Sequence, residues 1–126
     1  MRRLWVAVAL LAGLLAASLA NGWYTREVAG RITEQLALAQ KLAQQGEWDR
    51  AAERTRMAHA DWEDHQFYFH VVGRHGDIDG VWKGFRAVGE YLALREPDQY
   101  NAANAELMVQ LELLAEMEQP SLANVL

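Results

Sequence analysis

The chain has 126 residues, 52% of them apolar, a net charge of −5 at neutral pH and no cysteine. That length allows one domain with a core of three or four helices once an apolar N-terminal segment is set aside. The lack of cysteine excludes disulfides, thiolate nucleophiles and thiolate metal ligands, and two prolines with nine scattered glycines do not support a long disordered region.

The N-terminal segment has the composition of a membrane span. An uncharged run of seventeen residues, from Leu4 to Ala20, contains six leucines and two valines. Each of these favours insertion into a bilayer by about 0.3 to 0.6 kcal/mol. Extended to Tyr24, the helix would be about 31 Å long and would end in two aromatic residues, as expected at a membrane interface. Residues 1–24 are therefore predicted to be a membrane anchor that contacts lipid over residues 4–24.

A cleaved signal peptide is the competing interpretation of the same segment. Ser18-Leu19-Ala20 ahead of Asn21 fits the small-residue cleavage pattern. A retained anchor is favoured because the apolar run is long for a signal sequence and because aromatic residues follow the cleavage point. Either way, Arg2 and Arg3 should stay inside. The prediction is a single-pass protein of the cell membrane with a cytoplasmic N-terminus and an extracytoplasmic domain over residues 25–126.

The domain itself shows the apolar periodicity of helices. A first amphipathic helix, continuous with the anchor, is predicted before Gly46, and a second begins at Trp48. Asp77 is a plausible N-cap for a third helix ending near Pro97, and Asp98 for a fourth that stops at Pro120. The predicted inward positions are Val28, Ile32, Leu36, Ala39 and Ala43; Trp48, Ala51, Ala52, Thr55, Ala58, Trp62, Phe69 and Val72; Ile78, Val81, Trp82, Phe85, Val88 and Leu92; and Ala103, Leu107, Leu111, Leu114 and Met117.

These elements define the predicted fold class. It is all-α, with one N-terminal transmembrane helix followed by a small three- to four-helix antiparallel bundle. Three tryptophans, Trp48, Trp62 and Trp82, lie on the apolar stripes, and we expect them to fill the core rather than line a ligand pocket, since each buries roughly 150 to 250 Å².

A polar cluster in the second and third helices could in principle bind a divalent metal. Asp61 and His65 are one helical turn apart, but two ligands make a poor site. A third would have to come across a turn, from His75 or Asp79. The structural interpretation, in which these groups cap a helix or form a solvated face, is favoured. The cluster comprises Asp61, Glu63, Asp64, His65, His70, His75, Asp77 and Asp79. No metal site and no cofactor are predicted.

Catalysis and nucleic-acid binding find little support in the sequence. Ser18 lies in the apolar segment and Ser121 follows a proline, so no nucleophilic triad can be assembled. Beyond Tyr24 the chain has ten basic and seventeen acidic residues, a net charge of −7, which disfavours nucleic acid. We expect that the protein is not an enzyme and has no catalytic residues.

Several features of the chain together suggest a known family. They are the N-terminal span, Trp48, Trp62, the turn His75-Gly76-Asp77-Ile78-Asp79 and the terminal Ser121-Leu122-Ala123-Asn124-Val125-Leu126. In these features, and over nearly its whole length, the chain resembles the bacterial DUF4363 family (domain of unknown function), whose members are short proteins with one N-terminal membrane helix and a helical extracytoplasmic region. The resemblance implies a retained anchor and a compact helical fold, and no activity.

The leading functional hypothesis is therefore a non-enzymatic accessory or scaffold protein that binds another membrane protein or a second copy of itself. An extracytoplasmic ligand- or metal-sensing domain is the alternative. Phe67, Tyr68 and Val71 add apolar area beyond one buried stripe, so they are the candidate partner-binding surface. Coverage of these three residues by other helices or by the tail is the competing explanation.

Overall fold

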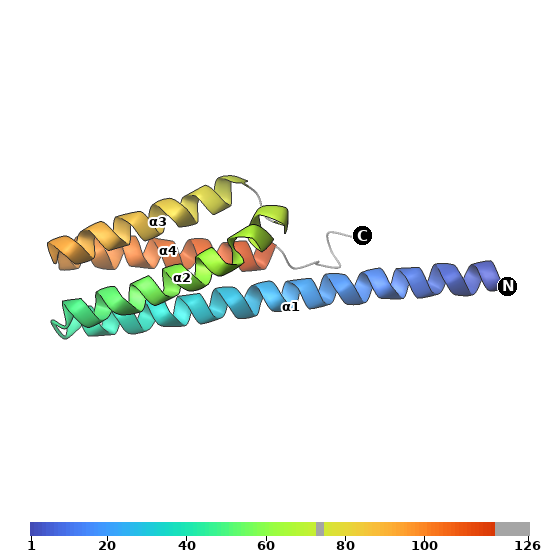
Figure 1. Cartoon of the computed structure of the whole chain (residues 1–126), viewed down its shortest axis with the longest axis horizontal. Coiled ribbons are helices and arrows are strands. Elements are labelled where there is room, and N and C mark those ends of the chain that lie inside the picture. Colours follow the sequence, from blue (N-terminus) through green and yellow to red (C-terminus); the bar gives the residue numbers. More distant parts are fainter. Residues whose placement is uncertain (73–74, 118–126) are drawn as a thin grey trace.

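A computed structural model describes the backbone of residues 1–72 and 75–117, with the side chains of residues 68–72, 75–77 and 116–117 left out of the description. It is all-helical, as predicted. The four helices are α1 (Arg2–Gln44), α2 (Trp48–Val72), α3 (His75–Leu94) and α4 (Pro97–Met117). They run alternately up and down, and the first half of α1 projects beyond the bundle as a single rod (Figure 1).

Two different regions make up α1. Residues 1–20 carry exposed apolar side chains, and the first buried residue is Gly22. This projecting part includes an 18-residue window with a mean hydropathy of 2.0 and no buried residue, so it is long and apolar enough to cross a membrane, as a signal sequence would also be. From Val28 to Ala43 the predicted inward residues are all buried. The predicted continuity of the apolar N-terminal segment with the first helix of the bundle is confirmed, because one helix contains both.

The turn between α1 and α2 explains why the chain reverses where the sequence indicated. Gly46 has a φ of +81°, a left-handed conformation that suits glycine. The Glu47 amide donates to the Leu42 carbonyl at 2.9 Å, and the Gly46 amide donates to the Ala43 carbonyl at 3.0 Å. These two bonds form the Schellman arrangement that satisfies the last carbonyls of a helix.

The same arrangement ends α3, but with an unusual residue. Arg95 has a φ of 55°, and the Glu96 amide donates to the Tyr91 carbonyl at 3.1 Å. Pro97 then begins α4, where its fixed φ suits the first helical position and its missing N–H costs nothing.

Both predicted N-caps are wrong by position. Because α4 begins at Pro97, Asp98 lies in the first turn of the helix rather than at the cap, where its carboxylate still faces the positive end of the helix dipole. Because α3 begins at His75, Asp77 is inside the helix, and Gly76 does not interrupt it. The third helix ends slightly before the predicted Pro97, and the predicted stop at Pro120 lies outside the described residues.

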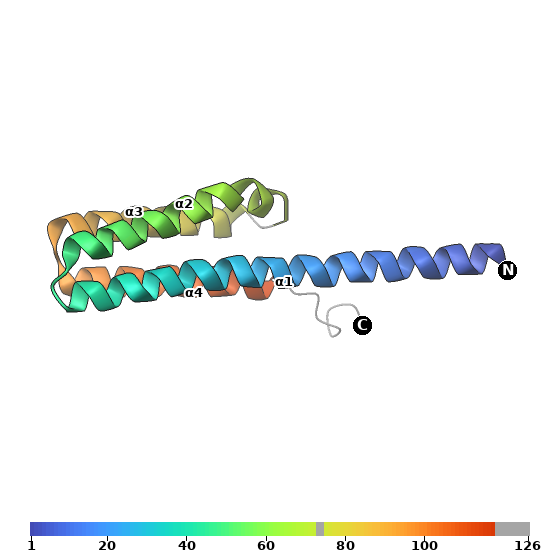
Figure 2. The same ribbon diagram turned by 60° about the horizontal axis from the view of Figure 1, so that its bottom comes forward.

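The helices form a ring in which each contacts two neighbours. Among the described residues, the backbone of α1 lies close to those of α2 and α4, and α3 lies close to the same two helices. Across one diagonal of the ring, the side chain of Trp48 on α2 reaches that of Tyr100 on α4. The contact between α2 and α3 is the sparsest of the four. Figure 2 shows the same bundle turned by 60° about its long axis, with α4 beside α1. The largest fully buried side chains are Trp62, Tyr100, Ile32, Leu36, Ile78, Leu107, Leu111 and Leu114.

The three tryptophans predicted to lie in the core differ in how deeply they are buried. Trp62 is 1% exposed, so its core placement is confirmed, and Trp48 is half-buried against the core. The core placement of Trp82 is wrong, because its side chain is 48% exposed. Trp82 follows the buried Val81 and so points about 100° away from the core-facing stripe. There the guanidinium of Arg86 lies 5.7 Å from its ring centroid.

Candidate interaction surface

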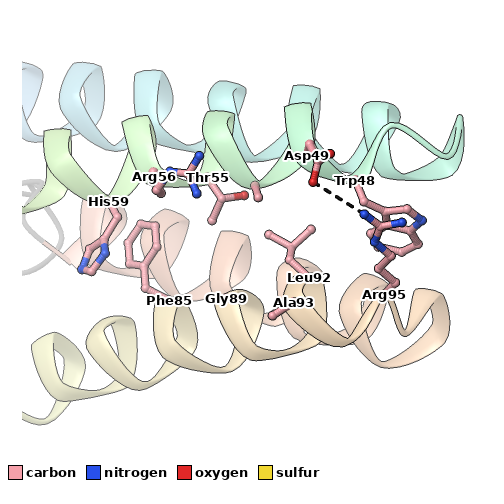
Figure 3. Close-up of a pocket in the computed structure, with 11 residues that line it drawn as sticks. Trp48, Asp49, Thr55, Arg56, His59, Phe85, Gly89, Leu92, Ala93 and Arg95 are labelled. Atoms are coloured by element: carbon pink, nitrogen blue, oxygen red, sulfur yellow. Dashed lines mark ion pairs between the residues drawn. The ribbon is translucent and has the colours of Figure 1, made fainter.

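A groove of about 360 Å³ lies between α2 and α3, where the ring of helices is loosest. Small residues line it, Ala52 on α2 and Gly89 and Ala93 on α3. Figure 3 shows Gly89 and Ala93 on the α3 side of the groove. A side chain at Gly89 would meet nothing within 4 Å, whereas one at Gly84 would lie 2.8 Å from Leu107 Cδ1 on α4. Helix α3 therefore packs closely against α4 and leaves its α2 side open.

Aromatic side chains stand at both ends of the groove. At one end, Trp48 meets the buried Tyr100 edge to face, with ring centroids 6.1 Å apart. At the other, His59 of α2 stacks on Phe85 of α3, with centroids 4.8 Å apart and planes at 16° (Figure 3). The two ends are separated by eleven residues of α2, or about 16 Å. The groove is thus long enough to take two to three turns of another helix.

The charges that line the groove are mainly positive. Arg95 lies 3.6 Å from Asp49, and both side chains are well exposed. Arg56 also lines the groove and forms no ion pair with any described residue. In a chain with a net charge of −5, the groove is therefore a region of locally positive charge, and such a region attracts negative groups.

A separate polar cluster joins α1 to α2 near the projecting part of α1. Arg31 donates two hydrogen bonds to Asp61, at 2.8 and 2.9 Å. These bonds hold the pKa of the Asp61 carboxyl below its ordinary value, and that carboxylate in turn raises the pKa of Arg31. His65 Nδ1 lies 2.8 Å from the Asp61 carbonyl oxygen and 3.3 Å from its carboxylate, and its ring is 5.8 Å from that of Tyr24.

This cluster bears on the metal hypothesis. Asp61 and His65 do meet, as their spacing indicated, but the Asp61 carboxylate is occupied by Arg31. Within the described residues, no group of three metal-binding side chains comes together. His59, which the sequence analysis did not include, lies 3.4 Å from Glu63 without hydrogen-bond geometry. Asp64 and Asp79 are exposed, and the side chains of His70, His75 and Asp77 lie outside the described residues.

The predicted partner surface can be assessed at one of its three residues. Phe67 is 81% exposed, so its ring is accessible, as an aromatic contact surface requires. The side chains of Tyr68 and Val71 lie outside the described residues. Sequence reasoning missed the groove altogether. The signal was present in Ala52, Gly89 and Ala93, but those residues belong to one surface only once α2 and α3 are known to be neighbours.

Comparison with known proteins identifies a family for this chain but no individual relative. A search of curated proteins found no match, and neither did a search of solved structures. The family described as a domain of unknown function, DUF4363, matches residues 22–125. That match begins where α1 first becomes buried, at Gly22, and it includes both helices of the groove. The chain therefore belongs to the DUF4363 family.

Proposed function

We propose that this protein is a non-enzymatic interaction module held at the outer face of the cytoplasmic membrane by its N-terminal helix. The observation that carries the proposal is the dual composition of α1. Its first twenty residues are exposed and apolar, and the rest of the same helix is a core element of the bundle. Since no linker separates the two parts, the anchor would set both the height and the orientation of the bundle.

The local structure at the alternative cleavage point supports a retained anchor. The bond between Ala20 and Asn21 lies inside α1, and Thr25 Oγ1 donates to the Asn21 carbonyl at 2.9 Å. Cleavage there would require the helix to unwind. The acidic bundle, with a net charge of −7 beyond Tyr24, would be repelled by anionic lipid and so would stand away from the surface.

Among the described residues, the groups with shifted pKa values owe their shifts to an ion pair or to burial. Shifted pKa values mark catalytic groups when they occur in a cleft. Here the pKa shifts of Arg31 and Asp61 arise from their mutual ion pair, and burial raises the pKa of Tyr100 to about 12. None of these three residues lines the groove.

Membrane topology tests the proposal directly, and the absence of cysteine makes the test free of background. Single variants Arg3→Cys and Glu53→Cys would be treated in intact cells with a membrane-impermeant maleimide. Glu53 is exposed on α2, so E53C should be labelled, whereas R3C should be labelled only after the membrane is permeabilised. Intact mass of the protein from the membrane fraction should include residues 1–20.

Two results would reject the proposal. A mature chain that begins at Asn21 and appears in the soluble extracytoplasmic fraction would show that the segment is a signal peptide. Labelling of R3C but not of E53C in intact cells would show the opposite orientation.

A further inference from the structure

The two helices that border the groove present outer residues at the spacing of a coiled coil. Positions separated by four, three and four residues share one helix face and can receive a further helix. On α2 these positions are Ala52, Arg56, His59 and Glu63, and on α3 they are Trp82, Arg86, Gly89 and Ala93. All eight side chains are exposed or half-buried, so these two faces together can bind a fifth helix.

The outer face of α4 has the same spacing and the opposite charge. Its exposed stripe consists of Ala102, Glu106, Val109 and Leu113, and both large apolar members are about half exposed. The helix has four acidic residues and no basic one. Glu106 forms no ion pair with any described residue, as is also true of Arg56 in the groove. An apolar stripe with an acidic residue would therefore complement an apolar groove with an unpaired arginine.

The bundle places Arg56 and Glu106 at the same height along α1. Asp61 lies opposite Arg31. Because α1 and α2 are antiparallel, equal numbers of residues counted in opposite directions reach the same height along the bundle. Arg56 lies five residues before Asp61 on α2, and Leu36 lies five residues after Arg31 on α1, so Arg56 and Leu36 are at the same height. Asn104 Nδ2 donates to the Leu36 carbonyl at 3.1 Å and to Gln40 Oε1 at 3.0 Å, which places that part of α4 at this height. Glu106 is two residues further on, about 3 Å along the axis.

Other members of the stripes match in the same way. Gly84 of α3 faces Leu107 of α4, and α3 and α4 are antiparallel. Trp82 lies two residues before Gly84, and Val109 lies two residues after Leu107, so these two side chains are at the same height. Gly89 lies five residues after Gly84, and Ala102 lies five residues before Leu107, so this pair is also at one height. In two copies fixed in one membrane by the same α1, Gly89 of one copy and Ala102 of the other are thus at equal heights.

We infer that the groove between α2 and α3 binds the outer face of α4 from a second copy of this chain. The inference rests on the proposed function, because the common anchor brings the heights of the two stripes into register. Arg56 pairs with Glu106 of the second copy, and Val109 of that copy packs against Trp82 and His59. Different surfaces meet in this contact, so the copies associate head to tail, in a ring or an open row within the membrane.

Cysteine crosslinking between separately tagged copies tests this contact. One copy carries Gly89→Cys, which has open space for the new side chain, and the other carries exposed Ala102→Cys. Because each copy has one cysteine, a disulfide between the two tags can only be intermolecular. In oxidised native membranes we expect this heterodimer in clear excess over the control pair Glu53→Cys and Ala102→Cys, which places one cysteine on the exposed surface of α2 outside the groove.

Charge reversal then tests the paired residues. Arg56→Glu in the copy with G89C, or Glu106→Arg in the copy with A102C, should reduce crosslinking to the level of the control pair. Combining the two reversals should restore it, because the ion pair is remade with its charges exchanged. Both sites are exposed, so the melting temperature of each variant should match that of the parent.

The experiments distinguish rejection of this contact between copies from rejection of the proposed membrane anchor. If the protein sediments with membranes and keeps residues 1–20, yet G89C and A102C crosslink no more than the control pair, the groove does not bind α4. Equal crosslinking after either single charge reversal would also reject the Arg56–Glu106 pairing. If residues 1–20 are missing from the mature protein, the proposed function fails first, independently of any crosslink.

Discussion

Two tryptophans that the sequence pattern assigned to the core, Trp62 on α2 and Trp82 on α3, have very different environments. Trp62 is buried between helices, whereas Trp82 lies on the flank of α3 beside the loosest contact of the bundle. Sequence periodicity placed both in the core, since a tryptophan next to a buried valine satisfies the pattern as well as one on the stripe itself. The energetic consequence of each position can be measured.

Trp62→Ala should lower the free energy of unfolding by about 3 to 5 kcal/mol, because it removes a large buried ring and leaves a cavity. Trp82→Ala is the matched control. It should cost about 1 kcal/mol or less, since it removes half-exposed area and the contact with Arg86. Urea unfolding of the full chain in detergent, followed by circular dichroism, measures both. Similar losses in the two variants would contradict the assigned faces of α2 and α3.

Tyr100 carries a buried hydroxyl with no hydrogen-bond partner among the described residues. Removing it in Tyr100→Phe should leave stability unchanged or raise it by up to about 1 kcal/mol at neutral pH, because no bond is lost and an unpaired polar atom leaves the core. Thermal melting at pH 7 checks this. A loss of more than about 1 kcal/mol would show that the hydroxyl is bonded.

The same residue predicts an alkaline transition. Burial raises the pKa of Tyr100 to about 12 in the folded protein, against about 10 in the unfolded chain. Below pH 10 both states keep the proton, so stability is fully present there. Between about pH 10 and 12 the unfolded state ionises first, and stability should fall by up to about 1.4 kcal/mol per pH unit. This component of the fall should be absent from the phenylalanine variant in the same titration.

At the scale of elements, helix ends and helix pairs show how far local rules reach. Gly46 ends α1 with the residue that a left-handed cap prefers, and the sequence predicted that turn. Arg95 ends α3 in the same left-handed conformation, which is sterically unfavourable for a residue with a side chain. The sequence therefore contains no local signal for a turn at that residue. The difference gives a stabilising substitution.

Arg95→Gly should stabilise the protein by about 1 kcal/mol, since glycine adopts a φ of 55° without the clash of a side chain. The lost ion pair with Asp49 is highly exposed, and such pairs contribute little. Thermal unfolding of the variant should therefore show a higher melting temperature, with Asp49→Asn as the control for the ion pair. A lower melting temperature in R95G than in D49N would mean that the arginine stabilises this turn.

The Arg31–Asp61 pair joins α1 to α2, and its effect should depend on pH. Asp61→Asn should lower stability at pH 7 by up to about 1 kcal/mol, the scale of a partly exposed pair. The pKa of Asp61 is depressed in the folded state, so the stabilisation is present above about pH 4 and is lost as pH falls through the folded value. The difference between D61N and the parent should shrink in acid. Asp64→Asn, an exposed neighbour, should show no such change.

At the scale of the whole molecule, the apolar N-terminal segment and the bundle share one helix but not one core. No residue from 2 to 20 is buried, and burial begins at Gly22. A chain that starts at Asn21 should therefore remain folded and become soluble in water, with a melting temperature close to that of the bundle in the full protein. Circular dichroism and size exclusion check this. Aggregation with loss of helix would show that the projecting segment stabilises the bundle.

The sequence by itself determined the features that depend on local periodicity and local chemistry. These include the apolar N-terminal segment, the number of helices, the glycine turn and most of the inward stripe of each helix, from Val28 through Leu114. Trp82 is the exposed exception, and the side chains of the predicted inward residues Phe69, Val72 and Met117 lie outside the described residues. Each is encoded within some twenty consecutive residues, where the helical period and a turn residue are enough. The predicted N-caps at Asp77 and Asp98 failed because several nearby residues can begin a helix, and a proline or the packing of the chain selects among them.

Only the tertiary structure decided what the flanks of the helices do. Three features depend on which helices are neighbours and on how closely they approach. These are the exposure of Trp82, the ion pair of Asp61 with Arg31 and the open groove beside Gly89. The equal height of Arg56 and Glu106 depends on bonds between residues as distant in sequence as Leu36 and Asn104. A residue on a stripe needs only its own helix to be assigned, whereas a residue on a flank acquires its environment from a second helix. That is why most of the core was predictable and the groove between α2 and α3 was not.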